Sequence, residues 1–339
     1  IPPFSEEYDH SQQNVVVNGP MAAAAMDAMC QEAGVTLLYH HTLCDALTRD
    51  ARVTEILVAA KGGLQAIRGG RFIDATGDGD LSALAGAAFQ LGEGEPPVLQ
   101  PGTLRFYWKD FHLEDIDRRQ VEESFRQGLE AGEIRRADYW SLEGSPYTIF
   151  HADGNNINHI SLNGADSLSR SQAEVEGRRS VAWARKRVKG AQRIQPVACG
   201  GEVAVRESRR IMGDHVITAA EYVGAAAYPD GVCYSYYPVD LHADGEQTLH
   251  NIAVTKDRVP QIPLSAMLVK GMDNLLAAGR CASGDRLAQS AFRVKASCMA
   301  MGQAAGAAAA LAAGRELREV PVEEIRSLLR AQGAIVPEI

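Results

Sequence analysis

Two short stretches of the sequence bring together side chains that could do chemistry. The first reads Arg-Glu-Ser-Arg-Arg over residues 206–210. If this segment is helical, Arg206 and Arg210 lie on the same face, and one of them could clamp a substrate carboxylate with its planar guanidinium group. The alternative is an internal network of salt bridges. Its acidic members would be Glu202, Glu207 and Asp214.

The second stretch reads Pro-Val-Asp-Leu-His over residues 238–242 and suits a strand. Side chains two residues apart on a strand point the same way, so Asp240 and His242 would lie side by side. A carboxylate beside an imidazole suits an acid/base pair that handles a proton during a reaction. The alternative is an ordinary surface histidine next to an aspartate.

The stretch that must position such groups runs from residue 274 to residue 311. Residues 275–278 form a short apolar run that stops at Gly279, as a buried strand would. A Ser-Gly-Asp loop at 283–285 follows, and then a helix rich in Ala and Gly. The positive N-terminal end of this helix would point back at the loop, which predicts a site for an anionic or electron-rich group. Plain packing of a helix on a sheet is the alternative.

The motifs from residue 274 onwards resemble a large family of FAD-dependent oxidoreductases. They read Asn-Leu-Leu-x-Ala-Gly-Arg, Ser-Gly-Asp, Gln-Ser, Arg-Val and Cys-Met-Ala-Met-Gly-Gln-Ala-Ala-Gly, in that order. The pattern Arg-Glu-Ser-Arg-Arg-Ile-x-Gly-Asp from residue 206 is similar to the family's as well. Its members have the glutathione-reductase-like flavoprotein fold. The resemblance therefore implies FAD as the cofactor, and hydride transfer between a small organic substrate and the flavin.

The resemblance also implies a set of cofactor contacts, carried over position by position. The carboxylate of Asp285 would bond the ribityl chain, and the N-terminus of the final helix would face the pyrimidine edge of the flavin. The strand that ends near residue 77 would reach the flavin, and backbone near residue 43 would contact the adenine. The residues implied in this way are Leu43, Ala75, Thr76, Gly77, Gly279, Gly284, Asp285, Arg293, Ser297 and Met299.

The opening of the family's FAD-binding domain has no counterpart in this sequence. Family members begin with a strand, a Gly-x-Gly-x-x-Gly turn and a helix that hold the pyrophosphate, whereas this chain begins Ile-Pro-Pro-Phe. We expect that one βαβ unit, roughly 30 residues or more, is missing ahead of Ile1. The missing loop supports an alternative function of another class. In this alternative the chain is a flavin-free scaffold or binding module, which keeps a substrate or cap domain and half of the nucleotide-binding domain.

Residues 77–82 read Gly-Asp-Gly-Asp-Leu-Ser and approximate a dinucleotide-binding fingerprint, because they follow a strand and open a helix. Asp78 and Asp80 would place two carboxylates where phosphate charges must lie, and the repulsion argues against that function. We expect Asp80 instead to be the N-cap of a helix over residues 81–88.

The order of expected elements predicts an α/β fold. We expect an FAD/NAD(P)-binding three-layer domain, incomplete at its N-terminus, with an inserted α+β substrate or cap domain. The expected division is a first part of the FAD-binding domain at 1–97, the cap at 98–265, a second part of the FAD-binding domain at 266–314 and a C-terminal helical tail at 315–339.

Local patterns predict several individual elements. We expect a helix over residues 20–34, a strand over 35–39, a β-hairpin over 52–68 with its turn at Gly62-Gly63, and a linker to the cap at 92–97. In the cap we expect a helix over 169–188 with Ser169 or Ser171 as its N-cap. The tail should contain one helix over residues 322–331.

Composition narrows the range of functions. The formal net charge of −9 and the absence of a compensating Lys/Arg cluster argue against a nucleic-acid or anionic-membrane partner. No segment is apolar enough for long enough to span a bilayer, and the first residues do not resemble a signal peptide. The six cysteines include no Cys-x-x-Cys, so we expect no structural metal and a reduced, cytoplasmic setting. The expected partner is a small-molecule substrate, possibly a carboxylate, and the chain could form a homo-oligomer.

Overall fold

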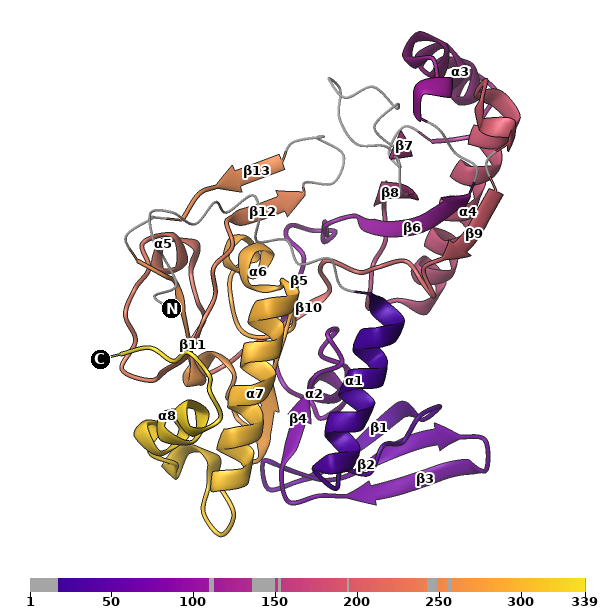
Figure 1. The fold of residues 1–339 in the computed structure, drawn as a ribbon. Helices are drawn as coiled ribbons and strands as arrows, with labels where there is room; N and C mark the ends of the chain where they lie inside the picture. Colours follow the sequence, from indigo (N-terminus) through magenta and orange to yellow (C-terminus); the bar gives the residue numbers. More distant parts are fainter. Residues whose placement is uncertain are drawn as a thin grey trace.

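The computed structural model describes residues 18–338, except 110–112, 136–149, 152–153, 194, 243–248 and 255–257. Helices and strands alternate along the chain, which makes the fold α/β. Figure 1 shows a three-stranded sheet at the lower end and a helix-covered sheet at the upper right. The long helix α7, Lys295–Leu311, stands to the left of both sheets in this view. Among the described residues, no helix is both long and apolar enough to cross a membrane.

The first helix, α1, spans Gly19–Glu32 and confirms the helix expected from residue 20. Asn18 is its N-cap and accepts a hydrogen bond from the backbone N–H of Met21 at 3.1 Å. The strand expected over residues 35–39 is wrong, because this segment has no strand conformation and pairs with no strand among the described residues. Tyr39 instead donates a hydrogen bond to Asp27 on α1, and its ring stays exposed. An apolar run becomes a strand only where a partner takes its backbone hydrogen bonds.

The next three strands form an antiparallel sheet in the order β1-β2-β3. They span Thr42–Arg49, Arg52–Ala60 and Gly63–Arg68, so the expected hairpin is confirmed. Asp50 and Ala51 take positive φ angles of 49° and 59° in the first turn, and Gly63 has φ 111° in the second. Positive φ at both central positions is what a tight hairpin turn demands.

Two short parallel strands lie in the part of the chain that is expected to bind the nucleotide. β4, Phe72–Asp74, pairs with β15, Leu275–Ala277, in the register Phe72↔Leu275. All three residues of β15 are buried, which confirms the buried strand expected there. Because both strands run the same way, their carboxyl ends carry Gly77 and Gly279 to the same edge, where α/β folds bind ligands.

The helix after β4 is shorter than expected. α2 spans Asp80–Leu84, and its N-cap is Gly79 with φ 66°, so the prediction of Asp80 as N-cap is wrong. Gly79 adopts a left-handed conformation that an aspartate would adopt only with strain, and Asp80 becomes the first residue of the helix. There its carboxylate binds Arg209 at 2.7 Å.

The segment expected to be an open linker is a closed turn. Glu93 and Val98 exchange backbone hydrogen bonds of 3.0 and 2.8 Å across residues 92–97. The preceding strand β5, Phe89–Leu91, pairs antiparallel with β10, Arg209–Ile211. This pairing overturns the helical face expected for Arg206 and Arg210, because β5 takes the backbone hydrogen bonds that a helix would have kept internal.

The cap contains a four-stranded sheet in the order β7-β8-β6-β9. These strands span Phe150–His151, Gly154–Ile160, Gly102–Lys109 and Gln195–Cys199. The helices α3, Arg118–Glu130, and α4, Ser167–Arg187, pack together through Phe125 and Trp183, whose ring centroids lie 5.9 Å apart. Short 3₁₀ turns at Leu113–Asp115 and Ala191–Arg193 flank them.

The N-cap of α4 is Asp166 and not Ser169 or Ser171. Asp166 Oδ1 accepts from the backbone N–H of Ser169 at 2.6 Å, and Ser169 Oγ instead accepts from the N–H of Asn163 at 2.8 Å. A carboxylate three residues ahead of Ser169 therefore accepts from a free N–H group of the first turn.

The remaining elements lie between residues 219 and 331. They are α5 at Ala219–Val223, β11 at Gly231–Tyr234, β12 at Val239–His242, β13 at Leu249–Ile252, β14 at Gln261–Pro263, a 3₁₀ turn at Leu264–Ala266, α6 at Arg286–Phe292, a 3₁₀ turn at Leu317–Glu319 and α8 at Val322–Ala331. The helix expected at 322–331 is thus confirmed.

One buried cluster joins Ile217, Val232 and Ile262 to Met301 and Ile325. Parts of the segment 217–264 therefore pack with α7 and α8. The sheet β7-β8-β6-β9 and its helices have separate cores around Leu104 and Trp183. The four-segment division made from the sequence stays a prediction.

Candidate functional site

Four of the side chains singled out from the sequence meet in one polar cluster: Arg206, Asp240, His242 and Arg293. Arg293 directly follows α6, and its Nη2 donates to the carbonyl oxygen of Asp240 at 3.1 Å and lies 3.7 Å from Asp240 Oδ2. Arg206, in the loop before β10, donates through Nη1 to the carbonyl of Pro101 at 2.6 Å. The charges of both arginines act on Asp240.

The pair on β12 has the geometry that its two-residue spacing predicts. His242 Nε2 lies 3.4 Å from Asp240 Oδ1, and both side chains are mostly buried. Two backbone contacts fix the strand, because the N–H of Asp240 donates to Ser290 Oγ on α6 at 3.1 Å and the N–H of His242 donates to Gln100 Oε1 at 3.3 Å. The other ring nitrogen of His242, Nδ1, is buried.

Burial and charge set the protonation of the cluster. Burial lowers the pKa of Arg206 to about 10, and the charge of Arg293 acts in the same direction. Burial also lowers the pKa of Arg293. Burial alone would raise the pKa of Asp240, but contact with His242 and the charges of Arg293 and Arg206 lower it overall. Asp240 is therefore a carboxylate, and it shares its charge between two guanidinium groups.

Two buried glutamines hold this cluster, and sequence reasoning missed both of them. Gln100 and Gln289 are fully buried. Gln100 Oε1 lies 3.5 Å from Arg293 Nη2, and its Nε2 donates to Gln289 Oε1 at 3.4 Å. Gln289 Nε2 in turn donates to the carbonyls of Arg206 and Arg280 at 3.2 and 3.1 Å. Gln289 stands in the Gln-Ser motif, which was the one available signal for its importance.

The carboxyl ends of β4 and β15 form a second part of the site. Gly77 and Gly279 have φ angles of 78° and 96° there, which disfavour any side chain. A Cβ at Gly77 would lie 2.5 Å from the guanidinium of Arg280, whereas a Cβ at Gly279 would meet only Cys298, at 3.8 Å. Arg280 therefore covers Gly77, and the backbone at Gly279 stays open. Sequence reasoning gave Arg280 no function.

The first turn of α7 faces the same edge. Its N-cap residue, Val294, provides no side-chain hydrogen bond to the helix, so the first N–H groups are available to an outside acceptor. The positive end of the helix adds to the charges of Arg280 and Arg293, which both act on Cys298 in this turn. Burial nevertheless raises the pKa of the Cys298 thiol. Uncapped donors, a bare glycine and two cations suit the electron-rich edge of a flavin.

Asp285 and Arg210 belong to another cavity, of about 430 Å³. Asp285 caps α6 by accepting from the N–H of Ala288 at 2.8 Å, and its other oxygen accepts from the N–H of Ala219 at 2.6 Å. Each carboxylate oxygen keeps a lone pair for a hydroxyl group. Arg210 pairs with the fully buried Glu207 at 2.5 Å, and Arg286 binds the same carboxylate at 3.0 Å. Arg210 thus belongs to the salt-bridge network that was the alternative to a substrate clamp.

The other residues implied for the cofactor are spread over the nucleotide-binding part. Thr76 Oγ1 donates to Asp74 at 2.7 Å and accepts from the N–H of Asp80 at 2.9 Å, which shapes the loop that contains Ala75 and Gly77. Leu43 lies on β1, opposite Val58, in the three-stranded sheet. Gly284 packs so closely on Phe292 that a Cβ there would lie 2.6 Å from the ring.

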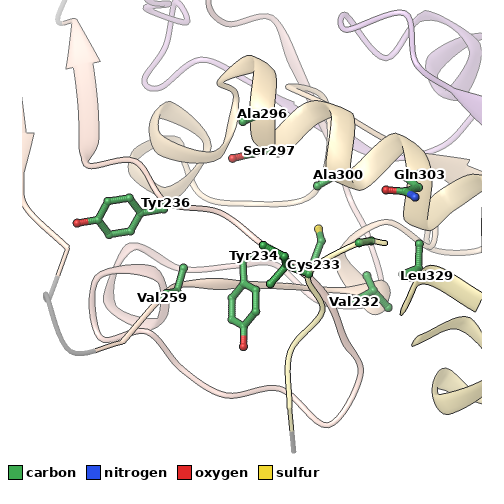
Figure 2. Close-up of a pocket in the computed structure, with 12 residues that line it drawn as sticks. Val232, Cys233, Tyr234, Tyr236, Val259, Ala296, Ser297, Ala300, Gln303 and Leu329 are labelled. Atoms are coloured by element: carbon green, nitrogen blue, oxygen red, sulfur yellow. The ribbon is translucent and has the colours of Figure 1, made fainter. Parts of the chain in front are cut away.

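Ser297 and Met299 lie on the first turns of α7. Ser297 is buried and its Oγ lies 2.8 Å from Ser235 Oγ, whereas Met299 is 69% exposed. Ser297 also lines a mostly apolar cavity of about 400 Å³ between α7, β11 and α8 (Figure 2). Tyr234 and Tyr236 line the same cavity.

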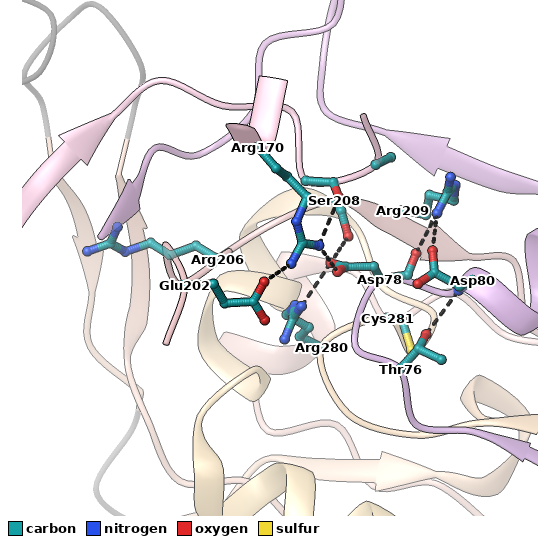
Figure 3. Close-up of polar contacts among 12 residues, drawn as sticks. Thr76, Asp78, Asp80, Arg170, Glu202, Arg206, Ser208, Arg209, Arg280 and Cys281 are labelled. Atoms are coloured by element: carbon teal, nitrogen blue, oxygen red, sulfur yellow. Dashed lines mark hydrogen bonds and ion pairs between the residues drawn. The ribbon is translucent and has the colours of Figure 1, made fainter. Parts of the chain in front are cut away.

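Asp78 joins the cap to the nucleotide-binding part (Figure 3). Its Oδ1 accepts from Arg280 Nη2 at 2.8 Å and from Ser208 Oγ at 2.5 Å, and its Oδ2 accepts from Arg170 Nη1 at 3.1 Å. Arg170 lies on α4 of the cap and Arg280 follows β15. The Asp78 side chain is 6% exposed, so a buried carboxylate holds these two cations together. The carboxylate of Asp78 therefore neutralises arginines and does not face a phosphate.

Comparison with known proteins gives one match. The family model described as FAD dependent oxidoreductase matches residues 4–329. No curated protein and no solved structure matches the chain.

Proposed function

The chain belongs to the FAD dependent oxidoreductase family, and from that premise we propose that it transfers a hydride between a small organic carboxylate and the flavin. FAD is the cofactor that the family implies. The observation that supports the substrate class is the cluster of Arg206, Arg293 and Asp240, in which two guanidinium groups face one carboxylate.

The charge of this cluster favours an anionic substrate. Arg206 and Arg293 place two guanidinium groups near the single carboxylate of Asp240. Like-charge coupling between the two guanidinium groups already lowers the pKa of Arg206. A bound carboxylate would relieve this repulsion and could accept two parallel hydrogen bonds from one guanidinium group. Two buried glutamines keep the arginines in place for that contact.

His242 is proposed to move the proton that accompanies hydride transfer. Asp240 orients the imidazole through the 3.4 Å contact at Nε2, and Nδ1 is the other ring nitrogen, which is buried. An imidazole held by a carboxylate at one nitrogen can exchange a proton with a reacting group at the other. Asp240 would not take up that proton itself, because contact with His242 and the two arginines keep its pKa low.

The residues around the first turn of α7 are proposed to hold the ring of the flavin. The uncapped N–H groups of α7 and the guanidinium of Arg280 would bind its electron-rich edge, and the bare backbone at Gly279 would lie against its face. Asp285 keeps lone pairs for a ribityl hydroxyl. Bound FAD supplies the hydride acceptor.

The experiment combines FAD with the chain and follows the loss of flavin absorption under anaerobic conditions. A panel of small hydroxy and amino carboxylates is compared with the amide of each compound. We expect the acids to reduce the flavin and the amides to react far more slowly. Arg206→Gln should raise the KM for a carboxylate about ten- to a hundredfold, because a hydrogen bond to a charged group contributes about 1.5–3 kcal/mol. Equal rates for acids and amides, or an unchanged KM in Arg206→Gln, would contradict the proposed substrate class.

A further inference from the structure

Four arginines line one cavity at the end of the molecule opposite the candidate site. The cavity has a volume of about 640 Å³, and its charged lining residues are Arg49, Arg52, Arg68, Arg71 and Asp50. It lies beside the turn between β1 and β2, where β3 ends and β15 begins. Gly77 and Gly279 follow the carboxyl ends of β4 and β15, whereas Arg71 and Asn274 precede their amino ends. The cavity is therefore separate from the proposed flavin site.

The frame of this cavity is fixed by one buried side chain. Asn274 is 2% exposed. Its Oδ1 accepts from the N–H of Val53 at 2.9 Å, and its Nδ2 donates to the carbonyls of Val53 and Gly70 at 2.8 and 3.2 Å. These bonds tie β2, the loop before β4 and the start of β15 together. The cavity walls are thus held in place without a ligand, as binding sites generally are.

Two of the four guanidinium groups are anchored at its base. Arg71 Nη2 donates to the carbonyls of Ala312 and Arg315 at the C-terminal end of α7, and its Nε is buried without a partner. Arg52 Nη1 lies 2.7 Å from Glu316 Oε2. The helix end and Glu316 hold these cations in place, while part of the donor capacity of Arg71 stays unused.

The other two arginines are free to turn towards a ligand. Arg68 pairs with Glu55 at 2.8 Å, but its side chain is 84% exposed, and exposed pairs of this kind contribute little. The Arg49 guanidinium makes no hydrogen bond or ion pair with any residue that the structure describes, and the backbone of Arg49 pairs with Arg52 at the end of β1. Four guanidinium groups therefore line the cavity in a chain whose formal net charge is −9. The carboxylate of Asp50 lies in the same lining, and Glu316 and Glu55 pair with Arg52 and Arg68.

We propose that this cavity binds a small, multiply charged phosphate compound. Guanidinium groups match the oxygens of phosphate in fork-like pairs, and several of them in one concave surface reinforce each other's field. The four guanidinium groups offer donors from several sides of the cavity, which favours an anion with several acceptor oxygens. A single carboxylate would leave most of these donors without an acceptor.

The test measures binding of inorganic pyrophosphate to the full chain by isothermal titration calorimetry. The first variant is Arg49→Ala, which removes no side-chain hydrogen bond or ion pair within the described part of the chain. The second variant is Arg68→Ala. The matched control is Arg179→Ala, because Arg179 lies on the surface of α4 and pairs with Glu176 at 3.0 Å. Circular dichroism of each variant checks that the fold is kept, and citrate serves as a carboxylate trianion for comparison.

We expect pyrophosphate to bind at one site, with about tenfold or greater weakening in Arg49→Ala and Arg68→Ala, the size of a lost hydrogen bond to a charged group. Arg179→Ala should bind like the unaltered chain. Equal weakening in all three variants would mean diffuse charge attraction, and the proposal would be wrong. It would be wrong as well if pyrophosphate did not bind, or if citrate bound as tightly as pyrophosphate.

Discussion

At the scale of single residues, the candidate chemistry depends on one carboxylate shared among three basic groups. Asp240 contacts His242 at 3.4 Å and Arg293 at 3.7 Å, and the charge of Arg206 acts on it as well. The contact with the histidine would orient a proton carrier, and the two guanidinium groups would receive a substrate anion. These two functions can be separated by mutation.

The histidine should control the rate and leave substrate binding nearly unchanged. His242→Gln is expected to lower kcat of the FAD-loaded chain by about a hundredfold or more, because positioned acid/base groups contribute about 10²–10⁴ in rate, with little change in KM. Stopped-flow reduction of the flavin measures this. His215→Gln is the matched control, because His215 pairs with Glu221 at 3.2 Å outside the cluster. A kcat within twofold of the unaltered chain would show that His242 moves no proton in the reaction.

The arginines should make substrate binding sensitive to alkaline pH. Burial lowers the pKa of Arg206 to about 10, so its guanidinium is charged below that pH and loses its charge as the pH rises through it. The KM for a carboxylate should therefore rise above pH about 10, and the KM for the matching amide should not. Because the folded pKa lies below the unfolded one, the buried charge of Arg206 opposes folding below that pH. Parallel KM profiles for acid and amide would refute this assignment.

At the scale of elements, the cap is held to the nucleotide-binding part through Asp78. One buried carboxylate accepts from Arg170 on α4, from Arg280 after β15 and from Ser208 before β10. Arg280 in turn covers the backbone of Gly77 at the proposed flavin edge. The contact that fixes the cap therefore also fixes a cation of the candidate site.

Removing this carboxylate should cost far more than removing a surface one. Asp78→Asn keeps the shape but leaves Arg170 and Arg280 without their anion, and breaking a buried pair costs about 3–5 kcal/mol. Urea unfolding measures the loss. Glu32→Gln at the exposed end of α1 is the control and should change the free energy of unfolding by no more than about 0.5 kcal/mol. Equal stability of Asp78→Asn and the control would mean that Asp78 does not join the two parts.

The elements that were predicted correctly are determined by residues that lie close together in the sequence. The hairpin at 52–68 has its turn glycines, α8 has a helical apolar pattern, and Asp240 and His242 need only a strand to lie side by side. Predictions from the local pattern were wrong where pairing with a segment distant in the sequence decides the conformation. The segment 209–211 is a strand because β5 pairs with it, and residues 35–39 are not a strand because nothing pairs with them.

The residues of the candidate site could likewise be predicted only where a local pattern or the family resemblance pointed to them. Arg293 came from the resemblance and Asp240 from strand spacing, and the structure brings them together. Arg280, Gln100 and Asp78 were missed because each acts through contacts between segments on the order of 100 or more positions apart, such as Asp78 with Arg280, which no local pattern records. Arg210 was a candidate because it would share a helical face with Arg206, and its buried pair with Glu207 shows that it belongs to a salt-bridge network.

At the scale of the whole molecule, the polar cluster, the open glycine at the end of β15 and the uncapped start of α7 lie in neighbouring segments. Asp240 docks on α6 through Ser290, and Arg293 stands between α6 and α7. The same region would therefore hold the flavin ring and the substrate carboxylate. The arginine-lined cavity lies at the other ends of β4 and β15, so its ligand and the flavin should bind independently.

The most direct test of this account is an absorption spectrum of the purified chain, before and after FAD is added and the excess is removed by gel filtration. We predict visible flavin absorption that elutes with the protein and is weakened in Arg280→Ala, whose guanidinium covers Gly77. A bare protein spectrum after incubation with saturating FAD would contradict the account, and would favour the flavin-free scaffold or binding module instead.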